Sequence, residues 1–144
     1  MRTRLRRIRL DGRTYTWRAE IGHVRGSGDC HRCVRLRAWG AGKTGRALQA
    51  DLLSTAWPAP SGACATDGSY PTTAEVRAII TYALGQGWPP DRRGGTFVLS
   101  EREHAARFAL PGFLLTDRLR TAEGADPTAR VIKAHEARPA AAPE

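Results

Sequence analysis

The chain has 144 residues and a formal net charge of +9, from 23 Lys and Arg against 14 Asp and Glu. This length favours a single domain, and no apolar run reaches the ~18 residues of a membrane-spanning helix. Three cysteines, an odd number, argue against a secreted disulfide scaffold. The N-terminus is basic but lacks the apolar segment of a secretory signal, so we expect a cytoplasmic protein with no membrane span.

The positive charge is concentrated in the first third of the chain. Residues 1–46 hold twelve Arg and one Lys against three acidic residues, whereas residues 47–144 hold ten basic and eleven acidic residues. Such asymmetry within one domain indicates an anionic partner, whether nucleic acid, an acidic protein or an anionic membrane surface. A GC-rich coding bias explains the preference for Arg over Lys, but it does not explain this concentration.

Alternating polar and apolar residues predict four antiparallel strands in the first half of the chain. The expected strands cover residues 7–10, 14–21, 34–39 and 48–52, and Asp11-Gly12 is typical of a tight hairpin turn. Because successive side chains of a strand point to opposite faces, one face of this sheet is expected to be apolar. Its residues are Tyr15, Trp17, Ala19 and Ile21, then Val34, Leu36 and Ala38, then Leu48, Ala50 and Leu52.

The clearest helix signal follows an irregular stretch over residues 55–71. Thr72 and Glu75 form a capping box, after which apolar residues recur at helical spacing. This apolar stripe consists of Val76, Ile79, Ile80, Ala83 and Leu84. We expect a helix from about Thr73 to Leu84 on the apolar face of the sheet. It should cover Trp17, Ile21, Leu36 and Leu52.

The remaining residues predict small elements and a tail. Residues 96–99 predict a short fifth strand, residues 100–108 a brief helix that opens with a second capping box, and residues 113–115 one more apolar patch. Residues 121–144, rich in Ala, Pro and charge, predict a disordered or loosely docked tail, at most a short docked helix. The expected fold is α+β, with one domain over residues 1–120. A four-stranded antiparallel sheet packs on one main helix, with a short fifth strand and a small C-terminal helical segment.

Two cysteines stand at a spacing that suits zinc. Cys30 and Cys33 form a C-x₂-C pair, which on a loop supplies half of a tetrahedral zinc site. The candidates for the other half are Cys64, His23, His31 and His104, none of which belongs to a second pair. The alternative is a pair of reduced cysteines near a hairpin. Zinc is therefore a possible cofactor rather than an expected one.

Other motifs give weaker indications of chemistry. Gly40 to Thr44 read Gly-Ala-Gly-Lys-Thr, but a phosphate-binding loop needs a glycine where Arg37 stands and a helix afterwards. The segment is more typical of a hairpin turn, with Lys43 at its tip as a candidate anion contact. Glu101 and His104 stand three apart on the expected short helix, either as a metal or acid–base pair or as solvated surface residues. No pattern of a known catalytic centre is present.

The polar face of the predicted sheet carries the main functional hypothesis. Guanidinium groups beside an exposed aromatic ring can hold phosphates and stack a base. The expected nucleic-acid-binding residues are Arg7, Arg9, Arg18, Arg35, Arg37, Trp39 and Lys43. The alternative for Trp39 is that the irregular stretch over residues 55–71 covers its ring. Glu20 and Asp51 should neutralise part of this face. It would serve a non-catalytic module that binds nucleic acid or another anionic partner such as an acidic protein.

Two other classes of function stay open at this point. One is a protein-interaction, immunity or accessory protein that uses the irregular stretch over residues 55–71. The other is a small zinc-dependent or nuclease-like enzyme centred on Cys30 and Cys33, with Cys64 as a third ligand.

Several runs of this sequence resemble a family of small uncharacterised actinobacterial proteins. The similarity reaches to about residue 120 and rests on residues 11–18, 30–33, 39–44, 70–72 and 94–97. The resemblance implies no established activity. Proteins of this kind are sometimes labelled integrases, but a tyrosine recombinase needs a terminal Tyr nucleophile on a larger helical domain. Here the last tyrosine is Tyr82, inside the expected main helix.

Overall fold

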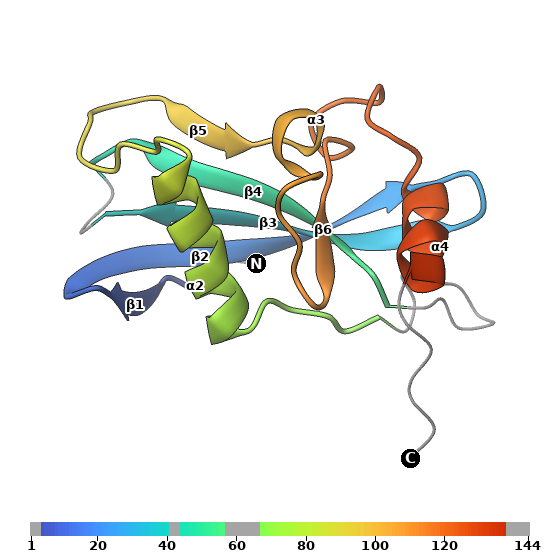
Figure 1. Ribbon diagram of the computed structural model, residues 1–144, viewed down its shortest axis with the longest axis horizontal. Helices are drawn as coiled ribbons and strands as arrows, with labels where there is room; N and C mark the ends of the chain where they lie inside the picture. Colours follow the sequence, from blue (N-terminus) through green and yellow to red (C-terminus); the bar gives the residue numbers. More distant parts are fainter. Residues whose placement is uncertain (1–3, 41–43, 57–66, 138–144) are drawn as a thin grey trace, which may run out of the picture.

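The computed structural model of the protein describes residues 4–40, 44–56 and 67–137 and has an α+β fold (Figure 1). The strands are β1 (Arg6–Leu10), β2 (Arg13–Arg25), β3 (Cys30–Trp39), β4 (Ala47–Ser54), β5 (Thr96–Leu99) and β6 (Phe113–Leu115). The helices are α2 (Thr73–Gly85), α3 (Glu101–His104) and α4 (Pro127–Ala137). No helix in these ranges is long and apolar enough to cross a membrane.

The sheet contains the four predicted antiparallel strands and two more. Strands β1 to β4 follow one another in sequence order, and the turn between β1 and β2 has positive φ at both Asp11 and Gly12, as this hairpin type requires. The far edge of β4 is shared by two short strands. Strand β5 runs parallel to its first half, and β6 runs antiparallel to its second half. The predicted fifth strand thus joins the sheet, and the apolar patch at residues 113–115 becomes a sixth.

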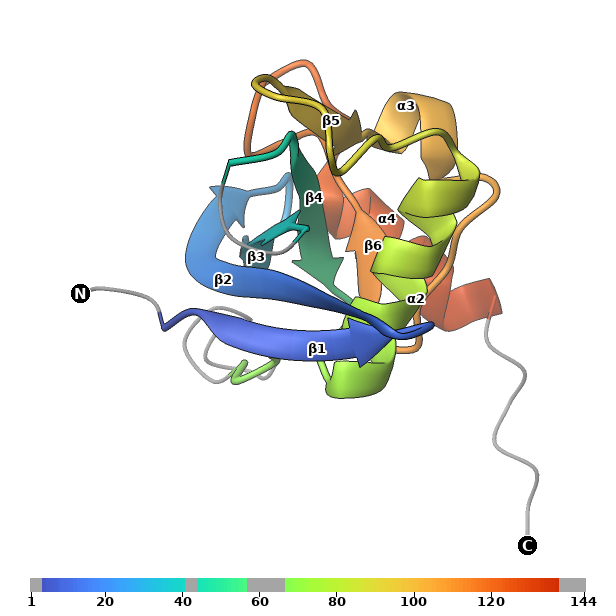
Figure 2. The same cartoon turned by 90° about the vertical axis from the view of Figure 1, so that its left-hand side faces the viewer.

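Helix α2 lies across one face of the sheet, as the sequence predicts (Figures 1 and 2). Its capping box is formed by Thr72 and Glu75. The side chains of the stripe that faces the sheet are fully buried, namely those of Val76, Ile79, Ile80 and Ala83. They pack with Trp17, Leu36 and Leu52 in the main core.

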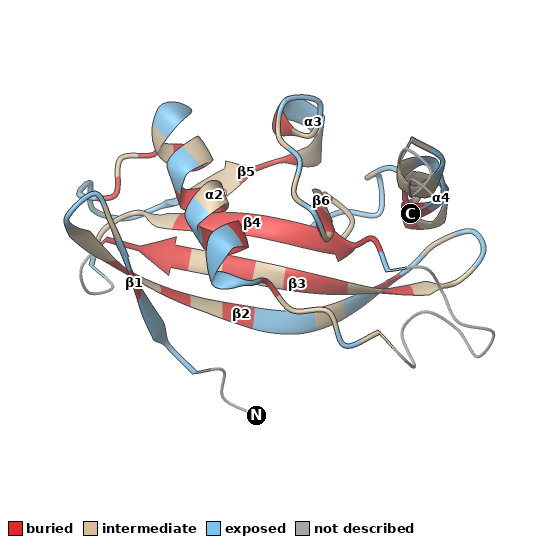
Figure 3. Ribbon diagram, turned by 60° about the horizontal axis from the view of Figure 1, so that its bottom comes forward, coloured by how far each residue is buried: buried red, intermediate tan, exposed pale blue. Residues whose placement is uncertain are grey.

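The prediction that α2 also covers Ile21 is wrong, because this side chain is 42% exposed. Strand β2 has 13 residues and spans about 43 Å, whereas the 13-residue helix α2 spans about 20 Å. The helix therefore covers only part of the strand, and the middle of β2 is open to solvent (Figure 3).

A second, smaller core lies on the opposite face of the sheet. Val24, Cys33 and Leu53 pack there with Val131 of α4, which is 1% exposed. Cys33 and Val34 are neighbours in β3, so the two cores use opposite faces. Of the two forms expected for residues 121–144, the docked helix is the one that the structure describes, over Pro127–Ala137.

Hydrogen bonds fix the start of α4 to the loop between β2 and β3. The Asp126 carboxylate accepts the Ser27 backbone N–H at 2.8 Å. The Thr128 hydroxyl accepts the Gly28 N–H at 3.1 Å and lies 2.8 Å from Nε2 of the buried His31. Burial lowers the pKa of His31, which favours the neutral imidazole in this contact.

Candidate functional site

The strand register places the predicted arginines on one face of the sheet. Thr16 stands between Arg7 of β1 and Trp39 of β3. Arg37 stands between Arg18 of β2 and Gln49 of β4, and Arg35 stands between Glu20 and Asp51. By strand alternation this is the face opposite α2. We call it the arginine face and define it by Arg7, Arg9, Arg18, Arg35, Arg37 and Arg120.

Asp51 neutralises one end of the arginine face. Its carboxylate is 1% exposed and accepts two hydrogen bonds from the Arg35 guanidinium, at 2.8 Å from Nε and 3.1 Å from Nη2. The Gln49 amide lies 3.4 Å from the same carboxylate, and Nε of Arg120 lies 3.8 Å from it. The hydrogen bond to Asp51 raises the pKa of Arg35. A bidentate pair of this kind leaves Arg35 with little free charge.

Arg18 and Arg37 form a weakly compensated pair on this face. They stand directly opposite each other across β2 and β3, where two like charges repel. Arg37 donates from Nε to the neutral amide oxygen of Gln49 at 3.2 Å, and Arg18 lies 3.6 Å from the half-exposed Glu20. Nε of Arg18 is buried and has no hydrogen-bond partner among the described residues. An anion that bridged the two guanidinium groups would offset this repulsion.

The expectation of an exposed indole at Trp39 is wrong. Trp39 is 7% exposed, and the guanidinium carbon of Arg18 lies 5.7 Å from its ring centroid. A cation over the ring is a stable arrangement, and it blocks the stacking of a base on that side. The indole is thus in a position to support Arg18.

The two arginines of β1 extend the face toward solvent. Arg7 and Arg9 are exposed on this edge strand, and Arg9 donates from Nη2 to the Gly12 carbonyl at 3.3 Å. Within the described residues, the Arg7 side chain makes no hydrogen bond or ion pair. Lys43, which the sequence placed at the tip of a turn, lies outside the described residues.

The zinc hypothesis required the two cysteines of the C-x₂-C pair to lie on a loop, and they do not. Both belong to strand β3, where residues three apart point to opposite faces and are about 10 Å apart along the chain. Cys33 is fully buried in the second core, and burial raises the pKa of its thiol to about 12. Two thiols so placed cannot chelate one ion.

The wider set of zinc-ligand candidates gives no alternative centre within the described ranges. Cys64 lies outside them. His31 contacts Thr128, and Nδ1 of His104 accepts the Ser100 N–H at 3.1 Å. In residues 4–40, 44–56 and 67–137, no group of three or more His, Cys, Asp or Glu side chains could hold a metal.

Glu101 and His104 also take separate roles. Glu101 accepts the Asp117 N–H at 3.0 Å, and Asp117 accepts the Glu101 N–H at 2.8 Å. His104 is 8% exposed and packs edge-on against Tyr82, with ring centroids 5.9 Å apart. The reciprocal Glu101–Asp117 pair fastens α3 to the turn after β6, and it is not directed at the imidazole.

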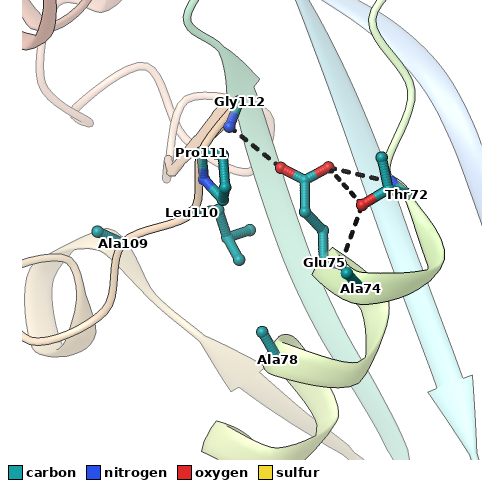
Figure 4. A pocket seen from close by; sticks show the side chains of 8 residues that line it. All are labelled: Thr72, Ala74, Glu75, Ala78, Ala109, Leu110, Pro111 and Gly112. Carbon is teal, nitrogen blue, oxygen red and sulfur yellow. Dashed lines mark hydrogen bonds between the residues drawn. The ribbon is translucent and has the colours of Figure 1, made fainter.

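A cavity of about 530 Å³ lies between the start of α2 and residues 109–112 (Figure 4). Its walls are mostly apolar, from Ala78, Leu110 and neighbouring residues. The Glu75 carboxylate at its rim accepts the Thr72 N–H at 3.0 Å and the Gly112 N–H at 3.1 Å. Because one Glu75 oxygen caps the helix and the other holds the loop, this cavity offers a ligand little polar recognition.

Sequence reasoning anticipated that Asp51 neutralises part of the face, but it missed Arg120. This residue lies in a turn far along the chain, where no periodicity indicates which side chains share a surface. No protein-family profile, curated protein or solved structure matches this chain. The arginine face is therefore the feature from which a function is inferred.

Proposed function

We propose that the protein is a non-catalytic module that binds nucleic acid through the phosphates, using the arginine face. The observation that carries this proposal is the opposed pair Arg18 and Arg37, with Arg7 and Arg9 beside it on the same face. The carboxylates of Glu20 and Asp51 offset only part of this charge. An extended row of guanidinium groups on an open sheet fits a polyanion better than a single small anion.

The proposed binding mode is electrostatic and independent of base sequence. Guanidinium groups contact phosphate oxygens in a fixed fork, which positions the protein on the backbone without reading base edges. The burial of Trp39 removes the stacking platform that single-strand readers use. We therefore expect similar affinity for duplexes and single strands of mixed sequence, with a steep dependence on salt.

Fluorescence anisotropy with labelled duplex DNA, single-stranded DNA and RNA tests this proposal across roughly 50–200 mM salt. In the variant Arg7→Gln/Arg37→Gln, the slope of log affinity against log salt should fall by about 2, because each lost phosphate contact removes about 0.9. The matched control is Arg77→Gln/Arg107→Gln, which removes the same charge from exposed residues outside the face.

Two results would contradict the proposal. One is equal affinity of the wild type and the Arg7→Gln/Arg37→Gln variant for every nucleic acid tested. The other is an equal loss in the control, because binding would then depend on net charge alone. Binding to an acidic protein in place of nucleic acid would assign the same face to a protein partner.

A further inference from the structure

Strand β2 has an outer edge that β1 covers only in part. Strand β1 pairs with β2 over Arg13–Trp17, whereas β3 pairs with it from Thr16 to Arg25. Within the described ranges, residues 19–25 therefore have a strand neighbour on the β3 side only (Figure 3). We call the other side of residues 19–25 the open edge.

The open edge is regular enough to pair with another strand. Sheet edges are usually protected by a proline, a bulge or a covering segment. Residues 19–25 contain no proline, and their register with β3 is unbroken. A hollow of about 320 Å³ lies between residues 23–25 and the turn over residues 118–122, so this turn does not close over the strand. Antiparallel pairing uses about one backbone hydrogen bond per residue, so the open edge offers about seven.

The side chains beside this edge are apolar in the middle and positive at both ends. By strand alternation Ile21 and Arg25 lie on the α2 face, and so does Arg6 of β1, which stands opposite Trp17. Ile21 is 42% exposed. Arg6 and Arg25 are exposed, and neither forms an ion pair with another residue in the described part of the chain. An uncovered apolar side chain thus lies between two arginines that are free to pair with carboxylates.

We propose that the open edge binds an extended acidic segment of another protein, which joins the sheet as a strand antiparallel to β2. Charge complementarity selects this occupant. An apolar residue of the segment lies opposite Ile21, and an acidic residue lies opposite Arg25. A second acidic residue lies opposite Ala19, two positions along the same face from Arg6. The segment therefore reads acidic, any three residues, apolar, any residue, acidic.

A second copy of this chain is a poorer occupant. Two chains of net charge +9 repel each other, and a second β2 would bring His23 and Arg25 where the edge needs carboxylates. The proposal does not depend on the proposed function, because the arginine face lies on the other side of the sheet.

The first experiment measures the affinity of a labelled synthetic peptide, Asp-Thr-Glu-Thr-Val-Thr-Asp, by fluorescence anisotropy. Arg25→Glu should weaken binding about tenfold and keep the melting temperature, because Arg25 is exposed. Arg102→Glu, an exposed control on α3 with the same change in charge, should keep the affinity. The Arg7→Gln/Arg37→Gln variant of the arginine face should also bind the peptide like the wild type. A peptide with Lys at the three acidic positions should not bind.

The second experiment locates the peptide by amide hydrogen exchange. In the free protein, residues 19–25 should alternate between slow amides bonded to β3 and fast amides at the open edge. The peptide should slow the fast amides in the wild type.

Four outcomes would overturn the proposal. They are no peptide binding up to about 1 mM, an equal loss of affinity in Arg102→Glu, and binding without added protection at residues 19–25. The fourth is protection that rises with the concentration of the protein alone, because a second copy would then occupy the edge.

Discussion

Replacement of Asp51 by Asn should lower stability and raise nucleic-acid affinity at the same time. The Asp51 carboxylate is 1% exposed and binds Arg35 in a bidentate pair, with Arg120 at 3.8 Å. Loss of one partner from a fully buried ion pair costs about 3–5 kcal/mol. Here Arg35 and Arg120 are 28% and 32% exposed, so water can solvate the freed guanidinium groups. We therefore expect a decrease of about 1–3 kcal/mol in the free energy of unfolding.

The same substitution releases positive charge on the arginine face. One additional phosphate contact should raise affinity about fivefold near 0.15 M salt, as follows from a slope of about 0.9 per contact. Urea denaturation measures the first effect, and anisotropy well below the melting temperature measures the second. Glu20→Gln is the matched control, because Glu20 is 48% exposed and lies 3.6 Å from Arg18. It should raise affinity with little change in stability.

Two outcomes would refute this reasoning. A stability change below about 0.5 kcal/mol for Asp51→Asn would mean that the carboxylate does not hold the arginines as described. A loss of affinity in a folded Asp51→Asn protein would mean that the freed guanidinium groups do not contact the nucleic acid.

Three further predictions concern the packing around the face. Trp39→Ala should destabilise the protein by about 3–5 kcal/mol in urea denaturation, because the indole is buried, and a near-neutral effect would place the ring in solvent. Val131→Ala should lower the free energy of unfolding by about 1–3 kcal/mol, whereas Ile132→Ala, at a 42% exposed position, should lower it by less than about 0.5 kcal/mol. Equal losses in the two variants would contradict the docking of α4. Burial lowers the pKa of His31, so its contribution to stability should be present above pH ~6.5 and be lost as the pH falls through the lowered pKa. His31→Gln should flatten the stability profile below about pH 6.5, and an unchanged profile would assign the dependence to other groups.

The sequence predicts the local elements well, because short-range physics determines them. Strand alternation identifies the buried face through Tyr15, Trp17 and Leu36, and the turn at Asp11-Gly12 has the positive φ values that this dipeptide favours. The capping box at Thr72 and the helical spacing of the apolar residues locate α2. Each of these signals depends on residues within a few positions of one another.

The placement of the cysteines shows where a motif by itself misleads. The C-x₂-C spacing is typical of zinc sites when the chain turns between the two cysteines. Here the alternation that begins at Val34 continues back to Cys30, so the strand separates the two thiols. Strand alternation likewise places Trp39 on the polar face of the sheet. It does not show whether other residues cover the ring there.

The sequence by itself determined the sign of the surface charge, the face on which the arginines of β1, β2 and β3 lie, and the position of the main helix. Only the tertiary structure decided how much of that charge is free. Asp51 of β4 pairs with Arg35 of the neighbouring strand β3, and Arg120 reaches the same carboxylate from a distant turn. The second core also depends on the tertiary structure, because Val131 contacts Cys33 and Leu53 only where the end of the chain packs back on the sheet. Contacts between residues so far apart in sequence leave no periodic signal, and the packing of the whole chain selects them.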